Sequence, residues 1–418
     1  MSKKNWLWYK LICLALALAL IVPVLAACGG EEGEETPTSS PTPTVTVVPT
    51  VTPTSTPNLE PVKIGIIQDW SGPTAMSGWL SDAVSNLMEW YVKKQGGILG
   101  GRPIKFIKYD NRGTVAESTA GAIKLIRDDK VTIITEGGAT TASFFGVADA
   151  SDPLKVPYVE FGTNTALLTD YKWTATTIST EGERADLFCN FILNTLKPQK
   201  FGILAQEMAD GRAIWDKMKP RIEAAGVKIV FDEWVQPGTM DLMSYLTKMK
   251  RAQPDVLMSY LTADTFTAMF KQIEELGGWG GIQNFIGNEH GNSANITKLP
   301  AAQGSYSLAA YIPGSDDPGI VAFEKAWADR VAEDPGFGKK YSTAPLNTHS
   351  YYWNCYIVAI EAIKLAGSDD PAKVAEALRS GKVEADTAFG HMRIQPDGSA
   401  GVKDHIVQIK DGKLVLVN

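Results

Sequence analysis

The chain has 418 residues, of which 40 are basic and 47 acidic, giving a formal net charge of −7 at pH 7. This balance argues against a nucleic-acid-binding protein, which needs clustered positive charge, and suits a soluble, monomeric extracellular domain. The four cysteines include no Cys-x-x-Cys pair, so neither a disulfide framework nor a cysteine metal site is expected.

The first 28 residues have the pattern of a bacterial secretory signal. Three lysines precede an uncharged apolar stretch from Leu11 to Val22, which is short for a spanning helix of ~20 residues. The sequence Leu-Ala-Ala-Cys then ends at Cys28 and resembles the bacterial lipobox. It predicts a signal peptide over 1–27 and a lipid on Cys28, which would anchor the protein outside the cytoplasm to the bacterial cell membrane. An uncleaved anchor, or a plain signal with an incidental cysteine, is the alternative.

Residues 28–60 are predicted to be a lipid-anchored, disordered linker. Thr36 to Pro57 contains nine Thr, six Pro and three Ser in 22 residues, too few apolar groups to fold. At ~3.1 Å per residue this stretch reaches roughly 70 Å, enough to lift a domain off a membrane. Beyond it remain about 360 residues, more than one core usually holds, so two lobes are expected.

From Val62 onward, strand-like and helix-like segments alternate. Short apolar runs predict strands at 62–67, 104–109, 131–134, 156–159, 201–204, 227–231 and 256–259. Helical spacing of apolar residues predicts helices over 78–95, 116–127, 180–196 and 241–251, and another ending at residue 225. Strands alternating with helices in this way indicate right-handed βαβ units and parallel sheets.

The last part of the chain has a different pattern. Residues 348–366 predict one long helix, and Pro371 opens another at its favoured first position. Asp411-Gly412 predicts a two-residue hairpin that joins strands 405–410 and 413–417. Cys189 and Cys355 lie in helix-like, apolar surroundings and are interpreted as two separately buried thiols.

Taken in order, these segments resemble the branched-chain amino-acid (Leu/Ile/Val) binding family of type I periplasmic binding proteins. Residues 63–73, 96–103, 108–111, 158–168, 285–289 and 395–401 carry the resemblance, which extends from Val62 to Asn418. It implies an α/β fold of two lobes, each a parallel sheet flanked by helices, with a ligand cleft between them and closure by hinge motion.

The resemblance also implies that each lobe is discontinuous in sequence. Lobe 1 is expected to comprise residues 61–176 and 312–396, and lobe 2 residues 177–311 and 397–418. Three hinge crossings are expected near 173–180, 308–313 and 394–402.

In lobe 1, the loop 135–143 follows a predicted strand and contains two glycines that permit a tight turn. Thr140 or Thr141 can cap the next helix while free backbone N–H groups face the cleft. In the family this loop recognises a carboxylate, which makes Thr140, Thr141 and Ser143 candidate ligand-binding residues. An ordinary helix cap is the alternative.

Two further lobe-1 loops are candidates. Gly162 and Asn164 match a family segment that holds the ligand's main-chain groups, although Asn164 stands where relatives often carry Thr. Trp70 and Ser71 follow the first strand and would place an aromatic ring at the mouth of the cleft, although a single Trp is as readily part of a core.

In lobe 2, Glu289 matches the family's amine-binding glutamate, whose carboxylate pairs with an ammonium group. A surface glutamate is the alternative. Asp210 replaces an aromatic residue, and Thr262 stands where branched-chain binders carry Tyr, with Tyr260 two residues earlier. These changes predict an altered specificity, with amino acids, aromatic acids, amides and other small polar solutes as possible ligands.

The function class expected is a solute-binding protein of an ABC importer, with permease subunits as partners. Neither a Gly-x-Ser-x-Gly elbow nor a phosphate-binding Gly-x-x-x-x-Gly-Lys loop occurs, and the four histidines lack metal-ligand spacing. No catalytic residue, metal or cofactor is therefore predicted. A receptor that signals through a separate membrane partner is the alternative, because the same fold serves both roles.

Overall fold

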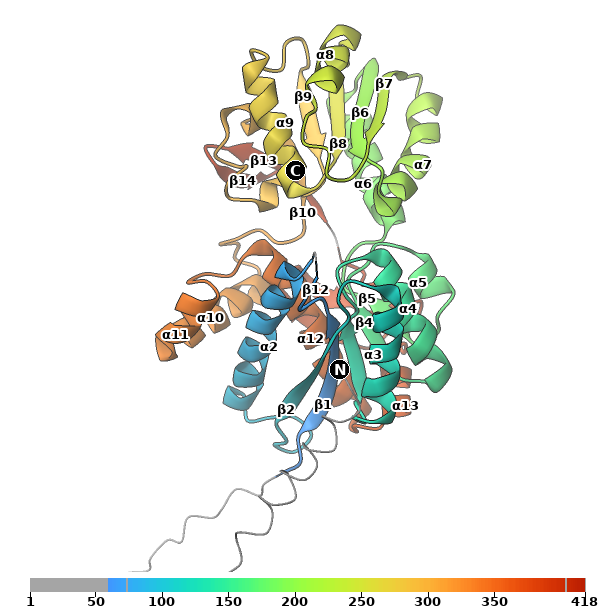
Figure 1. Ribbon diagram of the computed structural model, residues 1–418, viewed down its shortest axis with the longest axis vertical. Coiled ribbons are helices and arrows are strands. Elements are labelled where there is room, and N and C mark those ends of the chain that lie inside the picture. Colours follow the sequence, from blue (N-terminus) through green and yellow to red (C-terminus); the bar gives the residue numbers. More distant parts are fainter. Residues whose placement is uncertain (1–58, 73, 403, 418) are drawn as a thin grey trace, which may run out of the picture. The chain divides into compact units, whose positions relative to one another are not determined.

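The alternating segments fold into two lobes, each built on a largely parallel sheet, in the computed structural model (Figure 1). The structure describes residues 59–72, 74–402 and 404–417. The predicted signal, Cys28 and nearly all of the linker lie outside the described residues. Those that are described belong to one compact unit, Asn58–Asn418.

Lobe 1 holds a five-stranded parallel sheet of order β2-β1-β3-β4-β5. Its strands are β1 (Val62–Gln68), β2 (Ile104–Asp110), β3 (Ile133–Glu136), β4 (Tyr158–Glu160) and β5 (Thr174–Thr176). Its helices are α2 (Met76–Lys94), α3 (Val115–Arg127), α4 (Thr141–Ser151), α5 (Ala166–Thr169), α10 (Pro318–Glu333), α11 (Pro335–Lys340), α12 (Asn347–Ala366) and α13 (Pro371–Leu378). A hairpin of β11 (Glu384–Thr387) and β12 (Gly390–Arg393) completes it.

Lobe 2 holds a seven-stranded sheet of order β14-β13-β10-β9-β8-β6-β7. The strands β6 (Lys200–Gln206), β7 (Lys228–Val235), β8 (Val256–Tyr260), β9 (Asn284–Gly287) and β10 (Tyr306–Ala309) are parallel, and the hairpin β13 (His405–Lys410) and β14 (Lys413–Leu416) adds antiparallel strands at β10. Its helices are α6 (Glu181–Phe191), which a π-helical turn extends to Leu196, α7 (Ala209–Ala224), α8 (Met243–Ala252) and α9 (Ala263–Glu275).

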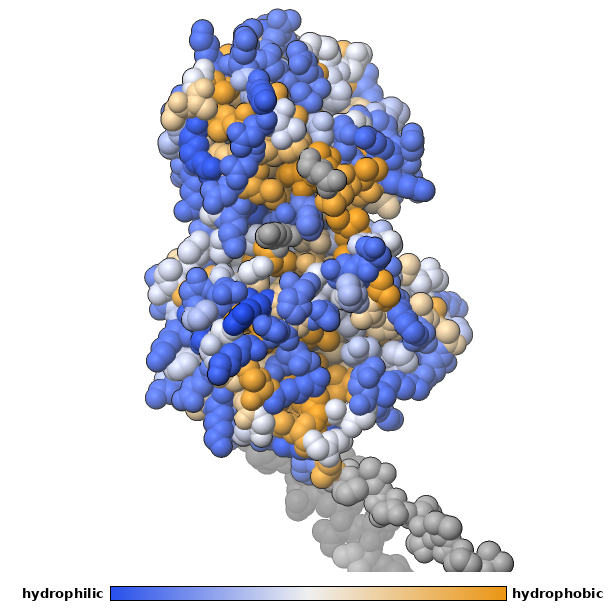
Figure 2. All heavy atoms as spheres, turned by 180° about the vertical axis from the view of Figure 1, so that it is seen from behind, coloured by the Kyte–Doolittle hydropathy of each residue, from blue (hydrophilic) through white to orange (hydrophobic). Residues whose placement is uncertain are grey.

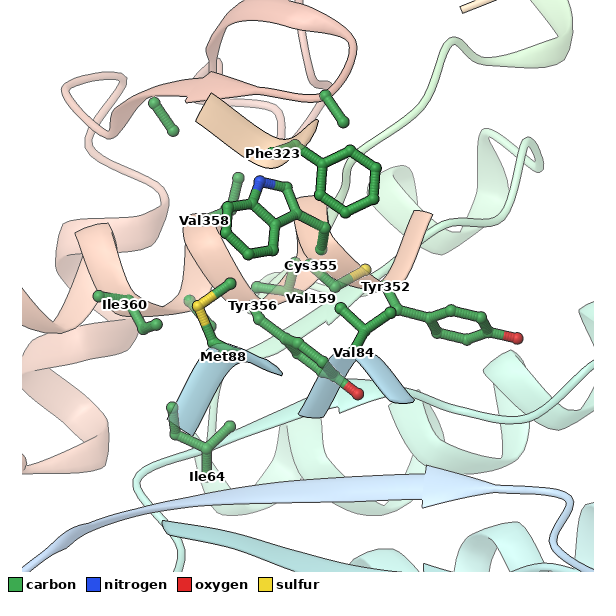
Figure 3. Packing of buried hydrophobic residues seen from close by; sticks show 14 of the residues in the cluster. Ile64, Val84, Met88, Val159, Phe323, Tyr352, Cys355, Tyr356, Val358 and Ile360 are labelled. Carbon is green, nitrogen blue, oxygen red and sulfur yellow. The ribbon is translucent and has the colours of Figure 1, made fainter. Parts of the chain in front are cut away.

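The inner strands of each sheet, such as β1, β3 and β8, are buried on both faces and almost continuously apolar, whereas the outer strands β2, β7 and β14 have exposed positions. In β1, Ile64 and Ile66 belong to the core under α2, α10 and α12, whereas Ile67 belongs to a second core under α3 and α4. Figure 3 shows Ile64 and Val159 of the sheet facing Tyr356 of α12 in the first of these cores. Lobe 2 has a corresponding pair of cores.

The chain passes between the sheets three times, through residues 177–180, 310–317 and 394–404. The crossings predicted near 173–180, 308–313 and 394–402 all overlap these segments, although Thr174 to Thr176 of the first belong to β5. The residue boundaries proposed for the two lobes stay a prediction.

Most predicted elements are present within two residues, including the long helix, the Pro371 start and the Asp-Gly hairpin. Cys189 and Cys355 are both buried and free, as predicted. Within the described part of the chain, no helix is both long and apolar enough to span a bilayer.

Candidate functional site

The loop after β3 is shaped by two glycines that no other residue could easily replace. Gly137 and Gly138 have φ of 112° and 113°, a region that side chains strongly disfavour. A Cβ on Gly138 would lie 2.4 Å from Nδ2 of Asn111 and 3.1 Å from Oδ1 of Asp69. The backbone therefore fits closely against the neighbouring strand ends as it enters α4.

The candidate hydroxyls of this loop cap the helix. Oγ1 of Thr140 accepts a hydrogen bond from the backbone N–H of Ser143 at 3.2 Å and donates to Oγ of Ser143 at 3.0 Å. Thr141 is the first residue of α4, and Ser143 is fully buried. Capping and ligand recognition are compatible here, because the first N–H groups of the helix stay free for an anion.

Two buried acids end the neighbouring strands, Glu136 on β3 and Glu160 on β4. Burial raises the pKa of Glu136 to about 7, although hydrogen bonds from Tyr356, Ser81 and Gln68 oppose the shift. Burial raises the pKa of Glu160 to about 8, opposed by the N–H of Gly162. Glu160 is thus largely neutral at pH 7 and Glu136 about half so, which limits their repulsion of an anion nearby.

The remaining lobe-1 candidates are held by local hydrogen bonds. The N–H groups of Trp70 and Ser71 both donate to Oδ1 of Asp110, and Oγ of Ser71 donates to its Oδ2 at 2.6 Å. Trp70 packs partly buried against the lobe-1 core. Oδ1 of Asn164 accepts from the N–H of Ala166 at 3.0 Å, so this side chain supports the start of α5.

In lobe 2, the structure brings two of the predicted residues into contact. The hydroxyl of Tyr260, at the end of β8, donates to Oδ2 of Asp210 at 2.7 Å. Tyr260 is buried, and burial followed by the negative charge of Asp210 raises its pKa well above the usual value. Thr262 is exposed, and its backbone N–H is fixed by Oε1 of Gln206 at 2.7 Å.

Glu289 belongs to a group of three charged side chains centred on Arg184. It follows β9 with φ of 47°, and its side chain is 24% exposed. Oε1 of Glu289 lies 2.7 Å from Nη2 of Arg184, and Nε of Arg184 lies 3.0 Å from Oδ2 of Asp404. Arg184 and Asp404 are almost fully buried, and Nε and Nη2 of Arg184 have no aligned hydrogen-bond acceptor among the described residues. These contacts are ion pairs, with two negative charges to one positive.

The second oxygen of Glu289 contacts lobe 1. The hydroxyl of Tyr351, in the first turns of α12, donates to Oε2 at 2.9 Å. The ring of Tyr351 packs against Phe161, which follows β4, and edge-on against Phe389. Glu289 therefore lies where the lobes meet, a region in which apolar residues gather on the face shown in Figure 2.

Sequence reasoning missed Arg184, Tyr351 and Asp404. Arg184 is the fourth residue of α6, after the Thr180–Glu183 capping box, where a cation is disfavoured by the helix dipole. An arginine in that position was a usable signal that carboxylates from elsewhere surround it. Tyr351 belongs to a long aromatic helix and had no distinguishing local pattern.

Comparison with known proteins agrees with this architecture. A family model described as "Periplasmic binding protein" matches residues 61–413. A Leu/Ile/Val-binding protein homolog of Brucella melitensis is 26% identical over 367 residues, covering 85% of this chain and 93% of that protein. The family and its neighbours are solute-binding proteins rather than enzymes.

Two solved structures show the same fold with different ligands. A branched-chain amino acid transporter substrate-binding protein from Streptococcus pneumoniae, in complex with isoleucine, has a TM-score of 0.71 at 18% identity, covering 86% of this chain and 99% of that one. A solute-binding protein of an ABC transporter from Rhodopseudomonas palustris, in complex with 3,4-dihydroxybenzoic acid, has a TM-score of 0.70 at 22% identity, covering 85% and 96%. The family implies a place outside the cytoplasm. The chain belongs to the branched-chain amino-acid binding family of type I periplasmic binding proteins.

Proposed function

We propose that this chain is the solute-binding lipoprotein of an ABC importer. It captures an amino acid, or a related small carboxylate or amide, between its lobes and delivers it to permease subunits. A lipid on Cys28 tethers it to the membrane through the Thr/Pro-rich linker, and the protein acts as a monomer. Mass spectrometry of the isolated protein tests the tether, because a chain that starts at Cys28 without a lipid contradicts it.

The observation that carries this proposal is the position of Glu289. Its carboxylate is partly exposed where lobe 2 meets lobe 1, and it belongs to a group with one more negative than positive charge. Among the residues that the structure describes, each carboxylate oxygen has a single side-chain partner, so further hydrogen bonds can be accepted. An ammonium or amide donor on a solute is the natural complement.

In this proposal, the lobe-1 loop 135–143 binds the other end of the same solute. The free N–H groups at the start of α4 and the glycine turn offer donors to a carboxylate. Glu160, which burial keeps largely neutral, and the partly neutral Glu136 oppose that anion less than two ionised groups would. Trp70, Gly162 and Asn164 complete this side.

The identity of the solute follows less directly from the lobe-2 side chains. Asp210 is paired with Tyr260, and Thr262 is small and exposed. The relatives include proteins named for Leu, Ile and Val and a structure holding an aromatic acid. Aliphatic amino acids and aromatic acids therefore head the solutes to be tried.

A thermal-shift screen over amino acids, amides, aromatic acids and short-chain acids tests the proposal. A solute present at 100 times its Kd should stabilise the fold by about 2.7 kcal/mol, a clear rise in Tm. A flat response across the screen, together with no solute in uptake assays, would contradict a transport role.

The Glu289→Gln substitution then tests the lobe-2 assignment with any solute found that carries an amine. We expect affinity to fall about 10- to 100-fold, because a hydrogen bond to a charged group is worth ~1.5–3 kcal/mol. Glu233→Gln is the matched control, since Glu233 lies in the same lobe but pairs with Lys248 at the surface. Calorimetry with equal affinity for both variants would show that Glu289 does not touch the solute.

A further inference from the structure

A hydrogen bond from Tyr351 to Glu289 joins the two lobes away from the chain crossings, between one side chain of each lobe. Tyr351 belongs to α12, whose buried residues form the lobe-1 core, whereas Glu289 follows β9 of the lobe-2 sheet. The phenol oxygen and Oε2 of Glu289 are 2.9 Å apart, so the bond forms only when these two surfaces are in contact. It therefore reports, and stabilises, one relative position of the lobes.

Both ends of this bond are held in place. On the lobe-1 side, the Tyr351 ring packs between Phe161 at 6.0 Å and Phe389 at 5.1 Å between ring centroids. These aromatic contacts fix the direction of the hydroxyl, so little side-chain entropy is lost when the bond forms.

On the lobe-2 side, Glu289 is fixed by the buried ion pairs to Arg184 and, through it, Asp404. Arg184 lies in α6, directly after the crossing at 177–180, and Asp404 ends the crossing at 394–404. The carboxylate that meets Tyr351 is thus anchored beside two of the three crossings, where a hinge must turn.

We propose that Tyr351 is a latch residue that holds lobe 1 against Glu289 before any solute is bound. The phenol stays protonated as a donor, because burial and the negative charge of Glu289 raise the pKa of Tyr351 well above its usual value. Since Glu289 keeps capacity for a further donor, the latch and a solute amine bind the same carboxylate side by side. The lobe position seen here is then partly populated in advance, which raises affinity for a solute that binds this position, without adding a contact to the solute.

The latch operates whichever solute the cleft takes, so its test needs no ligand. Lys93 of α2 and Lys271 of α9 are exposed, one on each lobe, and can be replaced by cysteines for nitroxide labelling of the full chain. Double electron–electron resonance then gives the distribution of distances between the lobes. The chain without the added cysteines supplies the background from the native thiols.

We expect the ligand-free protein to show a short-distance population that Tyr351→Phe reduces about tenfold relative to the separated state, the loss expected for one charge-assisted hydrogen bond. Tyr171→Phe is the matched control, because Tyr171 donates to Asp149 at 2.6 Å within lobe 1 and should leave the distribution unchanged. Glu289→Ala, which leaves the phenol without this acceptor, should reproduce the shift, and adding Tyr351→Phe to it should change nothing more. A Tyr351→Phe distribution equal to that of the unsubstituted protein, or no short population in that protein, would overturn the latch.

Discussion

The two lobes share an architecture but present opposite chemistry at the ends of their strands. In lobe 1 the strand ends carry Glu136 and Glu160, buried acids whose raised pKa values favour the neutral form, next to a backbone turn that offers N–H groups. In lobe 2 the corresponding region carries charged side chains, with Arg184 between Glu289 and Asp404. One side suits an anion and the other a cation.

Under the proposed function, this difference would let one fold hold a small zwitterion from both sides. Neutral buried acids cost less desolvation than ionised ones, so lobe 1 stays compatible with a carboxylate. In lobe 2, Glu289 and Asp404 are removed from water as charged groups, which is unfavourable. Arg184 offsets this desolvation cost by pairing with both carboxylates. The lobe-2 site should therefore be the more sensitive to loss of a single charge.

The largest expected effect comes from removing that central charge. Arg184→Met should lower the free energy of unfolding by about 3–5 kcal/mol, because it leaves Glu289 and Asp404 unpaired beside one another. Arg221→Met removes an exposed ion pair with Asp186 in the same lobe and should cost about 1 kcal/mol or less. Urea unfolding measures both, and equal losses would mean that the buried cluster is no more important than a surface pair.

The pH dependence of stability tests whether Glu160 of lobe 1 is neutral in the folded protein. The pKa of Glu160 is near its ordinary value of 4.5 in the unfolded chain, and burial raises this pKa to about 8 in the folded protein. Unfolding therefore releases a proton between these pH values, and the stability that Glu160 contributes below pH 4.5 is lost as the pH rises toward 8.

Glu160→Gln should abolish that loss, making the variant more stable than the native protein at pH 8 by on the order of 3 kcal/mol but not at pH 4.5. Exposed Glu376→Gln, in the same lobe, is the control. Parallel pH profiles of Tm for native protein and Glu160→Gln would show that Glu160 is already ionised in the fold.

A smaller loss of stability is expected from a substitution in the glycine turn after β3. Gly138→Ala should lower the free energy of unfolding by about 2–3 kcal/mol, because alanine disfavours the positive φ at this position and its Cβ would clash with Asn111. Gly226 has a φ of 80° with open space around it, so Gly226→Ala serves as the control. It should lower the free energy of unfolding by about 1 kcal/mol. If the two losses measured by urea unfolding are the same, the close fit of the loop is not needed.

The fold was largely predictable because its signals are local. Buried strands such as Val62–Gln68 are short apolar runs between turn residues, and Pro371 and Asp411-Gly412 have strong positional preferences. The hairpin β11–β12 was not predicted, since Glu384–Thr387 and Gly390–Arg393 are polar at alternate positions on a lobe edge. Helix α10 was not predicted either, although its Asp317 cap, its Pro318 start and the helical spacing of its buried residues are local signals.

The site was less predictable, because its key contacts join residues distant in sequence. The resemblance to the family located Glu289. The glycine turn could be predicted from the sequence alone, because two glycines follow a predicted strand. Whether Glu289 had partners depended on Arg184 and Tyr351, which lie about 105 and 62 positions away in the chain. Likewise, the pairing of Asp210 with Tyr260 requires knowing that β6 and β8 are neighbours in the sheet.

The hairpin β13–β14 bears on how the protein is made. These strands, residues 405–416, complete the edge of a lobe-2 sheet whose other strands lie between residues 200 and 309. During synthesis or export from the N-terminal end, β10 would remain an unpaired edge until nearly the last residues arrive, and such an edge invites association with other chains. Lobe 2 is thus the late-folding half, and shortening the chain before residue 405 should produce aggregation rather than a smaller binding protein.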